Sequence, residues 1–134
     1  LMENGKGLQL LAGRINDTIQ RAIQVPELAA HANALGKALQ DVGATTKAAW
    51  ATGNPTEALA NAVPYLQAFG HTVLAWIWLD VALAAHASAD SNARTGRLAA
   101  ARFFFRYELP KIGAWLQVVR ERDLTCAELA EDAF

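Results

Sequence analysis

The sequence predicts an all-α fold, an up-down-up-down bundle of four helices, on three observations. Hydrophobic residues make up 53 % of the chain, and alanine, the best helix former, is the commonest of them. Four long stretches place apolar residues at intervals of three and four, which is the spacing of one helix face. No stretch gives a convincing strand pattern. With 134 residues, we expect a single helical domain over residues 1–134, large enough to bury its own core.

The first two helices are predicted over residues 3–24 and from Pro26 to Gly53. Proline is tolerated in a first helical turn, and glycine readily takes the left-handed conformation that closes a helix. The apolar stripe of the first helix consists of Leu8, Leu11, Ile15, Ile19 and Ile23. That of the second consists of Leu28, Ala32, Leu35, Leu39, Val42, Ala49 and Trp50.

The third helix is predicted to begin at Asn54-Pro55-Thr56-Glu57 and to be the central helix of the bundle. Asn is a favoured N-cap, Pro a favoured first residue, and Glu three positions after the cap can complete a capping box. Pro64 lies inside the helix, so we expect a kink there. Its stripe runs through Leu59, Val63, Leu66, Gly70, Val73 and Ile77. Beyond Val73 the helix is apolar on nearly every side, which implies several neighbours.

Residues 87–96 are polar and small, and we expect them to form the one substantial loop. The fourth helix then places Leu98, Phe105, Ile112 and Val119 at intervals of seven, which favours near-antiparallel bundle packing. Pro110 should bend this helix. A short terminal helix is a further option, with Thr125 and Glu128 as its capping residues.

The chain carries a net charge of −1, but residues 94–122 alone carry +5, which leaves −6 for the remainder. We expect these basic residues to face acidic helices of the bundle or a partner chain; a phosphate-bearing partner is the alternative. The single cysteine, Cys126, excludes an internal disulfide and a cysteine-built zinc site. The apolar run 73–79 stops at Asp80, short of the ~20 residues that span a bilayer, so no membrane span is predicted.

Bundle metal sites and catalytic histidines are weakly supported. A di-iron bundle needs Glu-x-x-His on two helices, and that pattern is absent. Glu27 and His31 lie four residues apart and could share a metal, but they have no partners in the sequence. His71 and His86 bracket the apolar third helix, and we expect them to be satisfied core or helix-end groups.

Asp80 is the sharpest anomaly, because it places a carboxylate in an otherwise apolar stretch. Burying it unpaired would be costly, so we expect an ion pair with an arginine or histidine, with Arg102 or Arg106 as candidates. A catalytic acid or base would need a second titratable group near it, and none is evident. No residue is therefore predicted to be catalytic, to bind a cofactor or to bind a metal.

Nucleotide and nucleic-acid binding are also weakly supported. The chain has neither a Gly-x-Gly-x-x-Gly loop nor a Walker pattern. Phe103 to Phe105 and Tyr107 lie near arginines, as in single-strand binders, but Phe105 belongs to the core stripe. The tryptophans are expected in the core, and any exposed one would mark an interface: Trp50, Trp76, Trp78 and Trp115.

Three blocks resemble, in order and spacing, the extra C-terminal helical domain of a bacterial subfamily of acyl-CoA dehydrogenases. They are Thr45-Thr46 through Trp50 with the turn Gly53-Asn54-Pro55, then residues 62–70 (Ala-Val-Pro-Tyr-Leu-Gln-Ala-Phe-Gly) with the following Trp76 helix, and residues 97–104 (Arg-Leu-Ala-Ala-Ala-Arg-Phe-Phe) ending in Glu108-Leu109-Pro110. The resemblance covers about residues 4–119. The chain does not begin with methionine, so we expect a C-terminal fragment of a longer flavoenzyme.

The resemblance implies a cytoplasmic, FAD-dependent parent enzyme that introduces an α,β double bond into an acyl-CoA. In that family a glutamate removes the α proton and flavin N5 accepts a hydride from the β carbon. None of these positions maps onto this chain, so its implied role is packing on the dehydrogenase core or on a second subunit of a homo-oligomer. Arg102 and Arg106 could approach the CoA phosphates across that contact. The alternative is a free-standing helical module for protein–protein interaction, without flavin chemistry.

Overall fold

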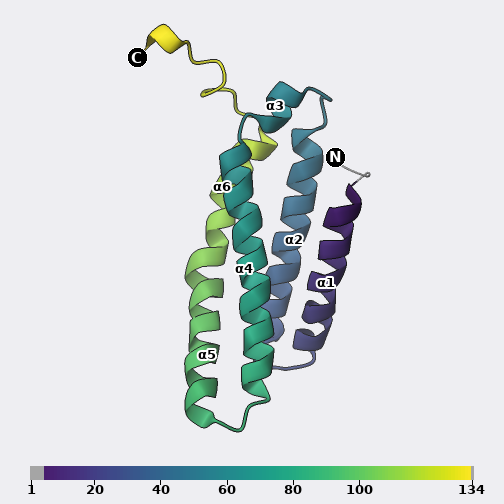
Figure 1. Ribbon diagram of the computed structural model, residues 1–134, viewed down its shortest axis with the longest axis vertical. Helices are drawn as coiled ribbons and strands as arrows, with labels where there is room; N and C mark the ends of the chain where they lie inside the picture. The colour runs from purple at the N-terminus through teal and green to yellow at the C-terminus, as the bar shows by residue number, and fades with distance from the viewer. Residues whose placement is uncertain (1–4, 134) are drawn as a thin grey trace.

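The computed structural model describes residues 5–133, which form four antiparallel rods (Figure 1). The first two rods are α1 (Lys6–Ile23) and α2 (Ala29–Ala49). A short α3 (Pro55–Leu59) precedes the third rod, α4 (Ala62–His86). The fourth rod consists of α5 (Ser91–Phe103), the π-helical turn η2 (Phe104–Glu108), the 3-10 turn η3 (Leu109–Lys111) and α6 (Ile112–Arg120). The predicted all-α bundle is confirmed, and the described residues contain no strand.

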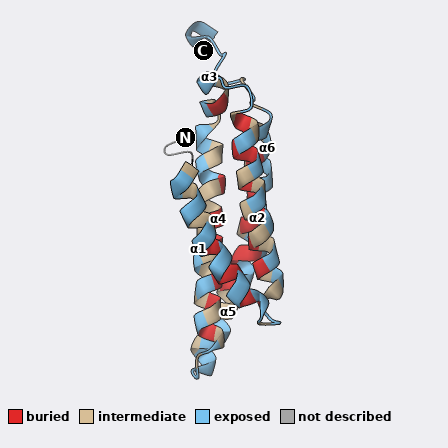
Figure 2. Ribbon diagram, turned by 90° about the vertical axis from the view of Figure 1, so that its right-hand side faces the viewer, coloured by how far each residue is buried: buried red, intermediate tan, exposed pale blue. Residues whose placement is uncertain are grey.

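α4 is the central helix, since it packs against α1, α2, α5 and α6. Buried residues line the surfaces where the rods face one another (Figure 2). Each rod contributes one large side chain that is almost completely removed from solvent: Ile15, Leu35, Leu79 and Leu116. Burying an aliphatic side chain of this size contributes about 1.5–3 kcal/mol, so these contacts hold the rods together.

The second helix starts and ends inside its predicted bounds. Pro26 lies in a turn in which the Leu28 N–H donates to the Val25 carbonyl at 2.9 Å, and regular α2 begins only at Ala29. At the other end α2 stops at Ala49. Gly53 has the expected left-handed φ of 69°, and its N–H donates to the Trp50 carbonyl at 3.0 Å. Gly53 therefore closes the turn after the helix rather than the helix itself.

The predicted kink at Pro64 is instead a complete break at residues 60–61, which separates α3 from α4. In a continuous helix the Pro64 ring would clash with the Ala60 carbonyl four residues earlier. With the break, Pro64 falls in the first turn of α4, where its missing N–H costs nothing. The Asn61 side chain donates to the carbonyls of Val118 at 3.2 Å and Asp123 at 2.8 Å. These bonds fix the break against the end of α6.

The expected cap of α3 is present in part. Asn54 Oδ1 accepts a hydrogen bond from the Thr56 N–H at 2.9 Å, which confirms Asn54 as the N-cap. Glu57 accepts from the Thr52 hydroxyl, and the Asn54 N–H donates to that same hydroxyl at 3.3 Å. The prediction of a reciprocal capping box was therefore wrong, because the Thr52 hydroxyl, and not the Glu57 carboxylate, accepts the hydrogen bond from the Asn54 N–H.

Two predictions about the last third of the chain were wrong. The predicted loop over 87–96 is short, because α5 already begins at Ser91. The N-cap of α5 is Asp90, whose Oδ1 accepts hydrogen bonds from the N–H groups of Asn92 and Ala93 at 3.1 Å each. The optional helix after Thr125 does not form: Asp123 accepts hydrogen bonds from Thr125, and only the 3-10 turn η4 (Glu131–Ala133) follows.

The bend expected at Pro110 is present as η2 and η3. Pro110 has no N–H to donate to the carbonyl of Arg106, so regular α-helical bonding cannot pass through this point. The chain responds with one π-helical turn followed by one 3-10 turn before α6 resumes. The apolar repeat continues to face the core on both sides of Pro110, because these residues are all buried: Phe105, Leu109, Ile112, Leu116 and Val119.

The interior face of α4 is not the predicted one. The buried residues of α4 are Ala68, Thr72, Ala75, Leu79, Ala82 and Ala85. The predicted stripe points outward instead, with Val63 67 %, Leu66 64 % and Ile77 49 % exposed. Small side chains allow the neighbouring helices to approach α4 closely, which explains why the alanine face is inside. Within the described residues, α4 alone is long and apolar enough to cross a bilayer by length and composition.

Candidate functional site

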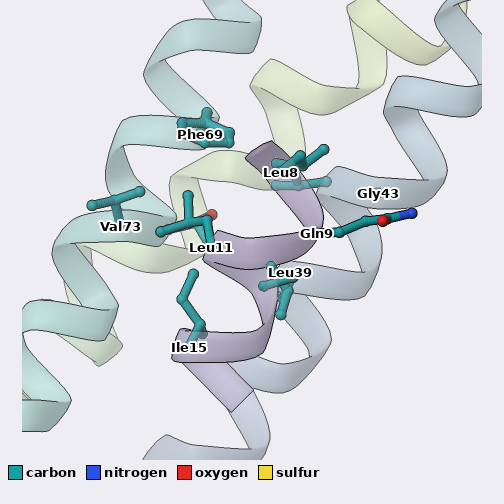
Figure 3. Close-up of a pocket in the computed structure, with 11 residues that line it drawn as sticks. Leu8, Gln9, Leu11, Ile15, Leu39, Gly43, Phe69 and Val73 are labelled. Carbon is teal, nitrogen blue, oxygen red and sulfur yellow. The ribbon is translucent and has the colours of Figure 1, made fainter. Parts of the chain in front are cut away.

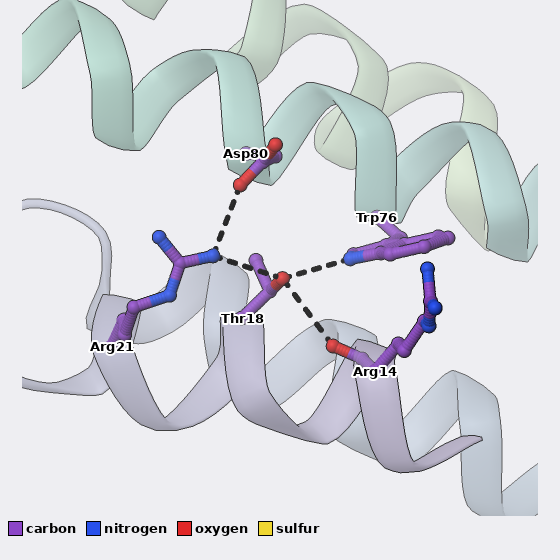
Figure 4. Close-up of polar contacts among 5 residues, drawn as sticks. All are labelled: Arg14, Thr18, Arg21, Trp76 and Asp80. Atoms are coloured by element: carbon purple, nitrogen blue, oxygen red, sulfur yellow. Dashed lines mark hydrogen bonds and ion pairs between the residues drawn. The ribbon is translucent and has the colours of Figure 1, made fainter. Parts of the chain in front are cut away.

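Asp80 forms part of a polar contact between α1 and α4 (Figure 4). Arg21 Nη2 lies 3.1 Å from Asp80 Oδ1 and 3.4 Å from Thr18 Oγ1. The same Thr18 hydroxyl accepts a 2.8 Å hydrogen bond from Trp76 Nε1 and lies 3.5 Å from the Arg14 carbonyl oxygen, to which it donates. The expected arginine partner is therefore present, but it comes from α1.

The prediction of a buried ion pair between Asp80 and either Arg102 or Arg106 was wrong. The side chains of Arg21 and Asp80 are 60 % and 59 % exposed, so neither charge has been taken out of water. An outward carboxylate on the edge of α4 has a low desolvation cost and needs no buried partner. This contact fixes α1 on α4 and brings no second acid or base to Asp80.

A second polar group lies where the start of α2, the end of α4 and α5 meet. Glu27, Leu28, His31, Leu98 and Arg102 line a cavity of about 290 Å³. His31 stacks on Phe105, with ring centroids 4.6 Å apart. Burial lowers the pKa of His31 below its ordinary 6.5, and the Arg102 guanidinium lowers it further. His31 is therefore held in the neutral form near neutral pH.

His86 extends this group at the end of α4. Its Nδ1 lies 3.9 Å from Glu27 Oε2, too far for a hydrogen bond, and is a buried atom without a hydrogen-bond partner among residues 5–133, so the expectation that His86 is satisfied was wrong. Glu27 and His31, the pair considered for a metal, do line one cavity, but Arg102 places a positive charge there as well. Among the described residues, no group of three or more metal-ligating side chains is present.

His71 is satisfied in the interface of α4 with η2, as expected. Its Nε2 lies 3.4 Å from Glu108 Oε1, and its ring meets Trp115 edge-on at 4.8 Å between centroids. Lys111 Nζ donates to Glu108 Oε2 at 2.6 Å, and this bond, with a smaller contribution from His71, lowers the pKa of Glu108. Glu108 thus links two elements of the fourth rod to α4.

Four arginines of the fourth rod are open to solvent. Arg94, Arg97, Arg102 and Arg106 are all exposed, and none belongs to an ion pair among residues 5–133. The expectation that acidic helices of the same bundle neutralise them was therefore wrong. Neutralisation by a partner stays a prediction. All four tryptophans are half-buried rather than fully in the core.

Sequence reasoning missed an apolar cavity of about 200 Å³ between α1, α2 and α4 (Figure 3). Its lining includes Leu11, Ile15, Leu39, Phe69 and Val73. An engineered cavity of about 150 Å³ with similar walls stays dry and binds benzene, so this one is large enough for a small apolar molecule. One signal in the sequence is Gly43, where an added Cβ would meet nothing within 4 Å.

These groups offer contacts between helices rather than an assembled set of acid, base and nucleophile. The prediction that no residue of this chain is catalytic stays a prediction. The sequence matches the family described as "Acetyl-CoA dehydrogenase C-terminal like" over residues 11–130. The matched range begins within α1 and extends past α6, so it includes nearly the whole bundle. No curated protein matches the chain.

Proposed function

The chain belongs to the acetyl-CoA dehydrogenase C-terminal-like family, and from this premise we propose that it is the helical C-terminal domain of an FAD-dependent acyl-CoA dehydrogenase. The parent enzyme would introduce a double bond between the α and β carbons of an acyl-CoA thioester in the cytoplasm. The family match over residues 11–130 is the observation that carries this proposal.

The residues present do not fit the flavin. The cavities near His31 and between α1, α2 and α4 measure about 290 and 200 Å³, at and below the lower limit of the ~300–1,000 Å³ of ordinary ligand pockets. The sequence also lacks a glycine-rich phosphate loop. We therefore assign FAD and the catalytic base to the rest of the parent enzyme, and to this chain a role in packing on the dehydrogenase core or on a second subunit.

The exposed arginines give this role a more specific form. Arg102 and Arg106 lie four residues apart across the junction of α5 and η2, and neither is paired among the described residues. Guanidinium groups suit phosphate oxygens, so we propose that these two arginines lie near the CoA phosphates of the parent enzyme. Charge reversal at either residue should raise the KM for acyl-CoA and leave kcat unchanged. Arg14→Glu, an exposed change on α1, is the matched control; equal KM values throughout would remove this idea.

The visible absorption spectrum of the intact parent protein tests the main proposal. A flavin band that bleaches on addition of one acyl-CoA from a panel is the expected result. A colourless parent that cannot be reconstituted with FAD would overturn the proposal and favour the free-standing interaction module. This chain alone should remain colourless after incubation with FAD, and retained flavin would contradict the assignment of the cofactor to the core.

A further inference from the structure

α4 carries two apolar heptad seams on different sides, and the bundle fully buries only one of them. The inner seam consists of Ala68, Thr72, Ala75, Leu79 and Ala82, all buried. The outer seam consists of Val63, Leu66, Gly70, Val73 and Ile77. Both alternate steps of three and four residues, which is the 3.5-residue period of helices that pack along one another.

The outer seam is partly open to solvent and free of charge from Val63 to Ile77. Val63, Leu66 and Ile77 are 49–67 % exposed, whereas Gly70 and Val73 are half-buried and Val73 also lines the cavity between α1, α2 and α4. From Ala62 to Leu79, α4 contains no Asp, Glu, Lys or Arg, so no charged side chain interrupts the seam before Asp80, its next step. A solvated helix face normally carries such residues. A seam of this kind is the pattern that a second α-helix would cover.

Further apolar side chains enlarge this surface. Leu74, next to the seam on α4, is 43 % exposed. Phe103 and Tyr107 stack on one another at 4.8 Å and are 55 % and 59 % exposed. They directly precede Phe104 and Glu108, the residues that contact His71 of α4. On α4 alone the exposed portions of Val63, Leu66, Leu74 and Ile77 amount to several hundred Å², which is below the ~800 Å² per partner of a standard interface but is a large patch for a monomer.

We propose that the outer seam is the contact between two copies of this chain, with their α4 helices antiparallel about a two-fold axis. This inference specifies the packing role proposed above and rests on it for its place in the parent enzyme. Two-fold dimers are the commonest assemblies, and their contact must be complementary to itself. The uncharged seam meets that condition, because pairing it with itself brings no like charges together.

The seam also sets the register of the pair. An axis between His71 and Thr72 places Gly70 opposite Val73 of the second copy and Leu66 opposite its Ile77. No residue in the described range 5–133 fills the space beside Gly70, where an added Cβ would have no neighbour within 4 Å. The antiparallel register sets a valine against each glycine. A parallel pair would set Gly70 against Gly70 and leave a gap between the helices.

The oligomeric state of the chain is the first test, by sedimentation equilibrium. The expected mass is twice 14.4 kDa for the unmodified chain and 14.4 kDa for Leu66→Glu. Leu10→Glu is the matched control, since Leu10 on α1 is also 64 % exposed, and it should leave the dimer intact. Circular dichroism establishes that each variant is folded. A monomeric unmodified chain, or a Leu66→Glu chain that still dimerises, would overturn the proposal.

Disulfide crosslinking tests the register in a Cys126→Ser background. Mixed chains with Leu66→Cys and Ile77→Cys should form a disulfide between different chains. Leu66→Cys alone should not, because antiparallel pairing holds the two copies of residue 66 about 16 Å apart along the axis, beyond disulfide reach. Efficient crosslinking of Leu66→Cys with itself would overturn the antiparallel arrangement. Co-flotation of the monomer with phosphatidylcholine vesicles would assign the seam to a lipid surface instead. None of these results depends on the flavin spectrum of the parent.

Discussion

Truncation of two leucines on α4 distinguishes its two faces. Leu79 is 0 % exposed within the core, whereas Leu66 is 64 % exposed. Leu79→Ala removes buried methyl groups and leaves a cavity, which costs about 3–4 kcal/mol of unfolding free energy. Leu66 loses only about a third of its surface on folding, so Leu66→Ala should cost about 0.5–1 kcal/mol. Leucine and alanine have similar helix propensities, so the difference between the two variants reports the difference in burial.

Urea unfolding followed by circular dichroism measures both costs. The experiment requires a concentration at which the chain is monomeric, because association would add its own stabilisation at Leu66. We expect the midpoint to fall much further for Leu79→Ala than for Leu66→Ala, with similar m-values. Equal losses in the monomer would refute the reasoning, since they would place the outer seam inside the bundle.

Smaller effects are expected at the polar contacts. Asp80→Asn should change the unfolding free energy by less than about 1 kcal/mol, because the ion pair with Arg21 is exposed; a loss of several kcal/mol in urea unfolding would show a buried pair. Trp76→Phe removes the bond to the buried Thr18 hydroxyl and should cost about 1–2 kcal/mol in the same assay, and a neutral result would contradict this. His31 should titrate below 6.5 by NMR, and Arg102→Gln should raise its pKa only in part, because burial is the larger cause. The unfolded chain protonates His31 at higher pH than the folded chain does, so stability should fall as pH drops through 6.5 towards the folded pKa. His31→Gln should weaken that dependence, and an unchanged pH profile would exclude His31 as its source.

The four helical rods could be predicted from the sequence because periodicity and caps are local signals. Asn54 took its expected role as an N-cap and Gly53 its expected left-handed conformation, since each acts within one turn of itself. The errors in the bounds of the helices arose where two local sequence signals compete. Ser91 to Gly96 has a loop-like composition, yet Asp90 caps α5 directly before it. At Pro64 the composition indicated a bend, and whether a helix bends or breaks depends on the contacts that Asn61 makes with the end of α6.

The candidate contacts were harder to predict than the helices. To predict the ion-pair partner of Asp80 one must know which helix lies beside its edge of α4, and that is a property of the whole bundle. The choice of core face on α4 failed for a related reason. Hydrophobicity ranks Leu66 and Ile77 above Ala68 and Ala75, but close approach of several helices to one central rod favours the alanines. The apolar cavity left no signal beyond small residues such as Gly43.

The misassigned stripe is itself informative about function. A helix that needs only one core face has no reason to keep a second charge-free heptad on its outer side, where apolar side chains favour aggregation. α4 already contacts the other three rods and its inner seam is buried, so the exposed residues of the outer seam are surplus to the fold of the single chain. Its regular spacing through Val63, Leu66, Gly70, Val73 and Ile77 sets it apart from scattered exposed leucines. The proposed place of the chain in a larger enzyme supplies a physical reason for such a surface, because a domain of that kind must be held by contacts that its own core does not provide.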